Sequence, residues 1–87
     1  MLVKQNKVPN IPLMPVKSSQ IAGVGYDLAS KTLAIKFNSG GLYYYAGVNA
    51  EEYLKLTNSK SIGTFFGSNI KNVFKFTKIG DIHEKTN

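Results

Sequence analysis

The chain of 87 residues contains no cysteine, no tryptophan and no arginine, and only five of its residues are acidic. Without cysteine it cannot form a disulfide, a thiolate nucleophile or a Cys-ligated zinc site, and the absence fits a reducing compartment. No apolar run reaches the roughly 18 residues that span a bilayer. The first residues, Met1 to Lys7, carry two lysines and lack the apolar core of a secretory signal. We therefore expect a cytoplasmic protein that has no membrane partner.

Residues that perform acid–base or metal chemistry are also sparse. The one histidine, His83, lies in a polar C-terminal segment, and Asp27 lies in a predicted turn. No paired carboxylates and no metal-ligand spacing occur, and the glycines match neither a phosphate-binding loop nor a dinucleotide fingerprint. We therefore expect that the protein is not an enzyme and needs no metal or cofactor.

What the chain has in excess is lysine. Eleven lysines against five acidic residues give a net charge of +6. Such a charge favours polyanions through counterion release and steering, and it is equally typical of a chain selected for solubility. Arginine makes the commonest bidentate contact to guanine, so its absence favours contacts to phosphates over the reading of base sequence.

The length allows one domain, which we expect to have three parts. These parts are an extended Pro-containing N-terminal arm over residues 1–15, a folded domain over 16–79 and a polar C-terminal tail over 80–87.

Within the arm, two sets of residues recur with a spacing of three: Pro9, Pro12 and Pro15, and Val8, Ile11 and Met14. In polyproline II conformation each set would form one ridge. The arm is either a Pro-rich ligand for an aromatic groove, or an extended segment that packs its apolar ridge on its own domain or on a neighbouring subunit. The second interpretation is favoured because the spacing alone is weak evidence.

Three segments have the pattern of β-strands: Gln20–Tyr26, Thr32–Phe37 and Leu42–Ala46. Turn residues between them predict an antiparallel meander. Gly23 and Gly25, inside the first segment, indicate a bulge or the close approach of another backbone.

The register of the second hairpin determines which tyrosines share a sheet face with Lys36. A loop of two or four residues pairs Ile35 with Tyr44, and Tyr43 and Tyr45 then lie on the face of Lys36. A three-residue loop pairs Ile35 with Tyr45, and Tyr44 then lies beside Lys36. A slip of one residue moves every side chain to the opposite face, and the sequence leaves both registers open.

Two short helices are predicted after the strands. Asn49 is a good N-cap and Glu52 completes a capping box, which predicts a helix to about Thr57. Ser61 caps a second helix, with apolar residues at helical spacing to Val73 or Phe74. Gly63 and Gly67 share one face of this helix and indicate a packing need or a contact site, because each weakens the helix by about 1 kcal/mol. Residues 74–79 form either a last short strand or an extended tail. The predicted fold class is α+β, with a three-stranded antiparallel β-meander followed by two short α-helices.

Several blocks of residues, in this order, resemble the KTSC domain family. The blocks are Pro15–Ile21, Val24–Asp27, Ile35–Gly41, Tyr43–Tyr45, and Ser61–Phe66 with Asn69–Lys71. The family is named for a C-terminal extension of some lysyl-tRNA synthetases and also occurs as stand-alone bacterial and phage proteins. The resemblance covers about residues 15–79 and implies the fold, and the attachment to a synthetase implies RNA binding. Asn49 stands where the family commonly has Pro, and Lys75 and Lys78 stand where it often has Arg.

The candidate binding residues combine lysines with tyrosines: Lys36, Tyr43, Tyr44, Tyr45, Lys71, Lys75 and Lys78. Lysines would hold phosphates while tyrosines stack on bases, at about 1–3 kcal/mol per base. Each tyrosine could equally be a core residue and each lysine part of a solvated rim. We expect a non-catalytic module that binds RNA or another single strand. The alternative is a protein-interaction module that docks on an acidic protein surface, such as a phage-encoded inhibitor of a host enzyme.

Overall fold

The structure, a computed structural model, describes residues 10–81. Val8 and Pro9 of the predicted ridges, and His83, lie outside the described residues. The elements, in chain order, are β1 (Met14–Pro15), β2 (Ile21–Asp27), β3 (Thr32–Phe37), β4 (Gly41–Ala46), α1 (Ala50–Thr57), α2 (Ile62–Asn69) and β5 (Phe76–Asp81).

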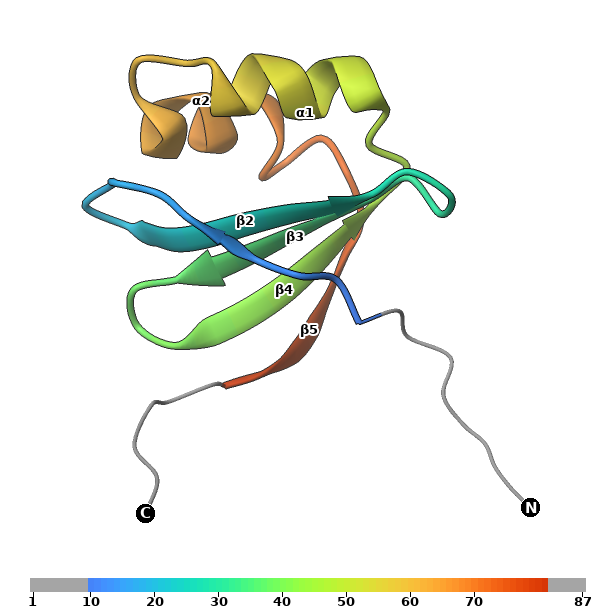
Figure 1. Ribbon diagram of the computed structural model, residues 1–87, viewed down its shortest axis with the longest axis horizontal. Helices are drawn as coiled ribbons and strands as arrows, with labels where there is room; N and C mark the ends of the chain where they lie inside the picture. Colours follow the sequence, from blue (N-terminus) through green and yellow to red (C-terminus); the bar gives the residue numbers. More distant parts are fainter. Residues whose placement is uncertain (1–9, 82–87) are drawn as a thin grey trace.

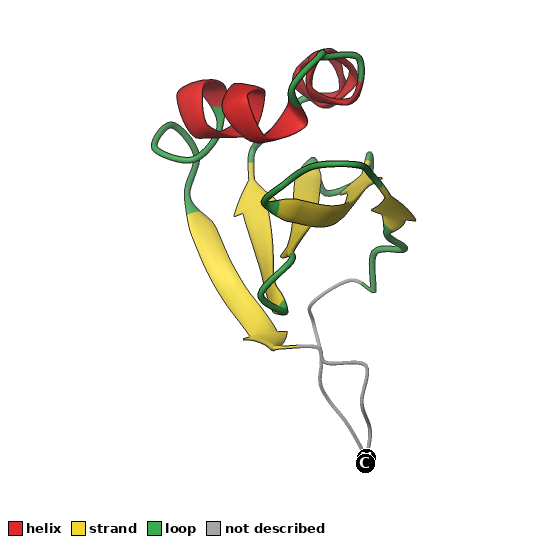
Figure 2. Ribbon diagram, turned by 90° about the vertical axis from the view of Figure 1, so that its left-hand side faces the viewer, coloured by secondary structure: helices red, strands yellow, loops and turns green. Residues whose placement is uncertain are grey.

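The strands form one antiparallel sheet in the order β1-β2-β3-β4-β5. Both helices lie between β4 and β5 in the chain and cover one face of this sheet (Figures 1 and 2). The predicted α+β class, with two helices and an antiparallel sheet, is therefore confirmed. The prediction of three strands is wrong, because β1 and β5 extend the meander to five.

The β3–β4 hairpin resolves the question of the tyrosine faces. Ile35 pairs with Tyr43, so the loop has three residues and neither predicted pairing occurs. Gly40 adopts the left-handed φ of 107° that this tight loop requires. Tyr44 lies on the face of Lys36, as the three-residue loop predicted, while Tyr43 and Tyr45 lie on the helix-covered face.

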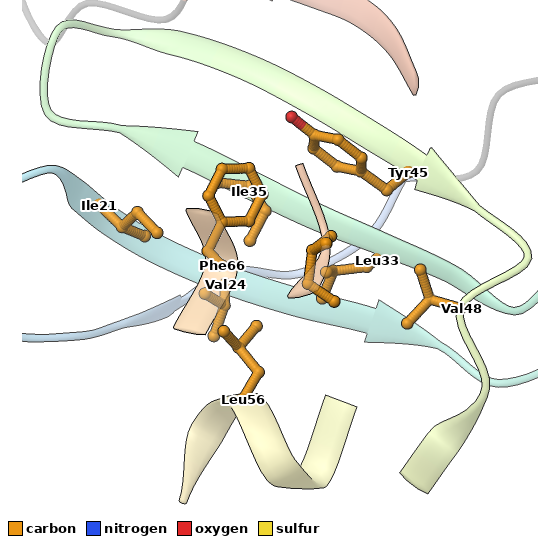
Figure 3. Packing of buried hydrophobic residues seen from close by; sticks show 9 residues of the cluster. Ile21, Val24, Leu33, Ile35, Tyr45, Val48, Leu56 and Phe66 are labelled. Atoms are coloured by element: carbon orange, nitrogen blue, oxygen red, sulfur yellow. The ribbon is translucent and has the colours of Figure 1, made fainter. Parts of the chain in front are cut away.

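The main core fills the space between the sheet and the helices. Its buried side chains, which Figure 3 shows, are those of Ile21, Val24, Leu33, Ile35, Tyr45, Val48, Leu56, Phe66 and Ile70. Leu56 of α1 and Phe66 of α2 point toward the strands (Figure 3). Burying aliphatic and aromatic side chains of this size contributes roughly 1.5–3 kcal/mol each.

Both helices begin at the predicted caps. Asn49 Oδ1 accepts a hydrogen bond from Glu52 N at 3.1 Å, and the Ser61 side chain accepts from Thr64 N. The second helix ends at Asn69, earlier than predicted. The carbonyl of Phe66 accepts from both Ile70 N and Lys71 N, and this pattern closes the helix into a turn.

The N-terminal strap, which we define as residues 10–13, crosses the sheet face opposite the helices (Figure 1). Ile11 is buried there with Ala34, Leu42 and Tyr44, and its N–H donates to the Tyr44 hydroxyl at 3.2 Å. At Gly25 an added Cβ would lie 2.1 Å from the Pro12 carbonyl oxygen, so this glycine permits the crossing. A bulge also occurs between Ile21 and Gly23. The bulge and the close approach of another backbone, the two features that Gly23 and Gly25 indicated, are therefore both present.

Candidate functional site

A groove of about 780 Å³ lies on the helix side of the sheet, between α2 and the paired strands β4 and β5. Its walls combine aromatic rings with two lysines, namely Phe37, Tyr43, Phe66, Phe76, Lys71 and Lys78. We refer to this hollow as the groove. It is the larger of two hollows that we describe. Its residues come from β3, β4, α2 and β5 and from three connecting segments.

The aromatic rings of the groove contact one another in edge-to-face and tilted arrangements. The centroid of the Tyr43 ring is 5.4 Å from that of Phe37, at an interplanar angle of 84°, and 5.5 Å from that of Phe76. The Tyr45 ring lies edge to face with that of Phe66, at a centroid distance of 5.3 Å, and is tilted against that of Phe76, at 5.6 Å. Such contacts fix ring orientations. Tyr43 is half-buried and Phe76 is 55% exposed, so both rings present surface to a ligand.

Strand pairing brings one of the two lysines to the rings. Lys78 of β5 lies opposite Tyr43 of β4, and its Nζ is 6.0 Å from the centre of the Tyr43 ring. Phe76 lies two residues earlier and therefore on the same face of β5. The resulting arrangement is a cation beside two partly open aromatic rings.

The second lysine approaches from the turn after α2. Lys71 is exposed and lines the groove together with Asn72. Its position is set by the hydrogen bond from its own N–H to the Phe66 carbonyl, at 2.9 Å. None of the described residues that line the groove is acidic. The described lining of the groove therefore contributes positive charge from Lys71 and Lys78 and no negative charge.

Burial raises the pKa of Tyr45, and the neighbouring Tyr43 adds a smaller electrostatic contribution in the same direction. The Tyr45 phenol therefore remains neutral at the pH at which lysines are charged. It supplies a wall of the groove and adds no negative charge to it.

The structure brings together only part of the predicted site. Tyr43, Lys71 and Lys78 meet in the groove. Tyr45 is 3% exposed and belongs to the main core, although it borders the groove. Tyr44 is 8% exposed beneath the N-terminal strap, on the opposite face of the sheet.

The two remaining predicted lysines lie elsewhere. Lys36 is on the strap-covered face, opposite Leu42 of β4. Lys75 is exposed, precedes β5 and does not line the groove; its carbonyl accepts from Ala46 N at 2.9 Å. These positions separate them from the aromatic rings of the groove.

Phe76 and Phe37 are groove residues that sequence reasoning missed. The signal for Phe76 was its spacing of two from Lys78, which places both on one face if the segment is a strand. The signal for Phe37 was its place in the alternation of β3. Neither pattern identifies a groove until α2 has been placed over the sheet.

Two classes of site find no support among residues 10–81. No group of three or more His, Cys, Asp and Glu in that range could hold a metal ion. No helix in the same part of the chain is long and apolar enough to cross a membrane.

Two curated relatives are lysine–tRNA ligases. That of Nostoc punctiforme is 35% identical over 68 residues, and that of a Nostoc sp. is 32% identical over the same length. In each case the match covers 78% of this chain and 12% of the ligase, so the chain spans about an eighth of the length of these relatives.

Two other relatives match over more of their own length. A protein of Stutzerimonas stutzeri is 34% identical over 56 residues, which are 64% of this chain and 79% of that protein. The crystal structure of a KTSC domain protein from Yersinia pestis matches with a TM-score of 0.79 and 37% identity, covering 82% of this chain and 100% of that one. The model of the KTSC domain family matches residues 17–74. The family model thus covers two thirds of the chain, and the fold matches that of a solved KTSC domain protein. The chain therefore belongs to the KTSC domain family.

Proposed function

We propose that the protein is a non-catalytic module that binds single-stranded nucleic acid, with RNA as the preferred ligand, in the groove. A base stacks against the open rings of Tyr43 and Phe76, while Lys71 and Lys78 hold the flanking phosphates. The observation that carries this proposal is the meeting of partly open aromatic rings and two lysines in one hollow where no described residue is acidic.

The geometry favours a single strand over a duplex. Bases in a duplex are stacked on each other and show only their edges, whereas an unpaired base can turn its face to an aromatic ring. Both open rings lie inside a groove, where the backbone of a rigid duplex could not follow them. The lack of arginine removes the commonest reader of guanine and favours binding with little sequence preference.

The relatives favour RNA over DNA. Two of them are named as ligases for lysine and tRNA, and the matching segment forms 12% of each of those proteins. A segment shared with an enzyme that acts on RNA is a reasonable candidate for contacting RNA. For this chain, RNA remains a proposal that the following experiment tests.

The test measures the fluorescence anisotropy of a labelled oligouridylate of about eight nucleotides, and compares it with a DNA strand and an RNA duplex of equal length. Each phosphate that a lysine neutralises contributes about −0.7 to the slope of log affinity against log salt. The two phosphates held by the groove lysines therefore contribute a fall of roughly sevenfold between about 50 and 200 mM NaCl. Changing Lys71→Gln and Lys78→Gln together should remove this contribution from the slope.

A matched control is the double change Lys31→Gln and Lys55→Gln, which removes the same charge at two exposed positions outside the groove. Phe76→Leu should weaken binding about 5- to 150-fold, because stacking contributes roughly 1–3 kcal/mol per base. An abasic oligonucleotide separates stacking from charge, since it keeps the phosphates and lacks the bases. Absence of binding to the oligouridylate at about 50 mM salt would end the proposal, and equal binding of the abasic strand would end the stacking role.

A further inference from the structure

A second, smaller hollow of about 200 Å³ lies beside the groove. It is formed by the loop before β2 and the turn that leads into α2, and its walls include Lys17, Ser18, Gln20, Lys60, Ser61 and Gly63. Most of its lining is polar, in contrast to the aromatic groove. We refer to it as the polar pocket.

The polar pocket and the groove adjoin each other, because Gln20 and Gly63 line both. Gly63 allows the loop to lie close to α2: an added Cβ would meet Ser18 Oγ at 3.3 Å and Gln20 Oε1 at 3.4 Å. A ligand that extends from the groove across Gln20 and Gly63 therefore reaches the polar pocket.

Hydrogen bonds hold both walls of the polar pocket in place. Ser18 Oγ accepts from the N–H groups of Gln20 and Ile21, at 3.1 and 3.2 Å. Asn38 ties the same loop to the β3–β4 turn, through its N–H to the Gln20 carbonyl at 2.8 Å and its side-chain amide to the Ser18 carbonyl at 3.1 Å. A pocket that is already ordered loses little entropy when a ligand binds.

The opposite wall is fixed in the same way. Ser59 Oγ accepts from Ser61 N at 3.1 Å and donates to the Ser61 carbonyl at 3.0 Å, which holds the turn that carries Lys60. Lys17 and Lys60, both exposed, thus face one hollow from two fixed segments. No described residue of the polar pocket is acidic, so the pocket suits phosphate and offers no ring on which a base can stack.

We propose that the polar pocket is the phosphate-binding continuation of the groove, so that the two hollows form one track for an oligonucleotide. The base of one nucleotide lies in the groove, and the backbone that follows passes Gln20 to reach Lys17 and Lys60. The ligand is then a run of at least about four nucleotides, which supplies a phosphate to each of the four lysines, and a mononucleotide fills only part of the track. This inference rests on the proposed function and adds to it the length of the ligand and its path over the surface.

The experiment is a length series, with uridine monophosphate and oligouridylates of about two, four and eight nucleotides as probes. It uses the wild-type protein, the pocket variant (Lys17→Gln with Lys60→Gln), the groove variant (Lys71→Gln with Lys78→Gln) and the outside control (Lys31→Gln with Lys55→Gln). Four lysine–phosphate contacts predict a slope near −2.8 for the wild type, a loss of roughly 50-fold between about 50 and 200 mM NaCl. The pocket variant should show only about a sevenfold loss.

Two further results are expected if the track exists. The affinity of the wild type should rise between about two and four nucleotides, and the pocket variant should lose this rise. Its affinity for the monophosphate should stay within about twofold of the wild type, which also shows that the variant is folded, because the monophosphate uses the groove alone.

Other outcomes would overturn the inference in distinguishable ways. If the pocket variant matches the outside control while the groove variant binds weakly, the polar pocket takes no phosphate and the proposed function remains. If polyglutamate of matched charge binds as tightly as the longest oligouridylate and competes with it, the track recognises an acidic polypeptide. If no oligonucleotide binds the wild type, both the track and the proposed function fail.

Discussion

Gly25 is the glycine at which a side chain would be least tolerated, because the N-terminal strap lies directly against it. A Cβ at this position would lie 2.1 Å from the Pro12 carbonyl oxygen and 2.9 Å from Ile11 Cγ2, and atoms cannot approach so closely. The oxygen belongs to the backbone, so only a shift of the whole strap could relieve the overlap. Such a shift would expose Ile11 and stretch its hydrogen bond to Tyr44.

Gly25→Ala should therefore lower the free energy of unfolding by about 1–3 kcal/mol, the usual cost of overpacking. Urea denaturation measures the change. Gly23→Ala is the matched control, because Gly23 lies on the same strand and face. Its added Cβ would lie 3.3 Å from the Met14 carbonyl oxygen, so this substitution should lower the free energy of unfolding by less. Alanine is otherwise better than glycine within a strand, so an unchanged or increased stability of Gly25→Ala would show that the strap does not press on Gly25.

The three consecutive tyrosines show how far a single sequence can predict this site. The tyrosine run and its lysine neighbours could be identified, but not which ring is open. Tyr43 faces the groove, Tyr44 lies beneath the strap and Tyr45 is sealed in the main core. These differences depend on α2 and the strap, which are distant in sequence from β4, and local pattern carries no information about such coverage.

At the scale of elements, α2 contains a glycine that packing does not explain. Gly63 faces the loop before β2, but a Cβ at Gly67 would meet no atom within 4 Å. Gly67 is exposed and lines the groove. Gly67→Ala should raise the stability of the protein by up to about 1 kcal/mol, because alanine favours the helix. It should also lower the affinity for an oligonucleotide, because the added methyl group would project into the groove and displace the ligand from α2. Losing a contact of about 1 kcal/mol lowers affinity by roughly two- to tenfold.

Ser68→Ala supplies the control for this prediction. Ser68 is exposed on the same helix and does not line the groove, so alanine there should raise stability without affecting binding. Denaturation and anisotropy on the two variants separate the effects. Equal affinities of Gly67→Ala and Ser68→Ala would show that the ligand does not run along α2.

The central elements were predictable and the outer strands were not. β3 and both helix N-caps occur at the predicted residues, because alternation and capping are local signals. β1 has two residues, too few to show alternation, and forms by pairing with β2. β5 contains an irregularity opposite Leu42 and Tyr43 that disrupts its alternation. Edge strands of this kind are specified by their partners more than by their own sequence.

For the whole molecule, the net charge of +6 should act in opposite directions on folding and on binding. Eleven lysines on a small domain repel one another, and this repulsion destabilises the free protein at low ionic strength. Raising NaCl from about 20 to 200 mM shortens the Debye length to less than 10 Å and screens the repulsion. We expect the melting temperature of the free protein to rise by roughly 2–4 °C, equivalent to about 0.5 kcal/mol.

Over the same salt range the affinity for an oligouridylate should fall, because the counterions that binding releases must enter a more concentrated solution. Thermal melts and anisotropy in one series of buffers test both trends together. The pocket and groove variants each carry two positive charges fewer than the wild type, so their melting temperatures should depend less on salt. The outside control also lacks two charges, so its melting temperature should show the same reduced dependence. Its affinity for the oligouridylate should stay that of the wild type. If the control lost binding as well, net charge would explain the affinity, whereas loss confined to the pocket and groove variants assigns it to the four lysines that line the track.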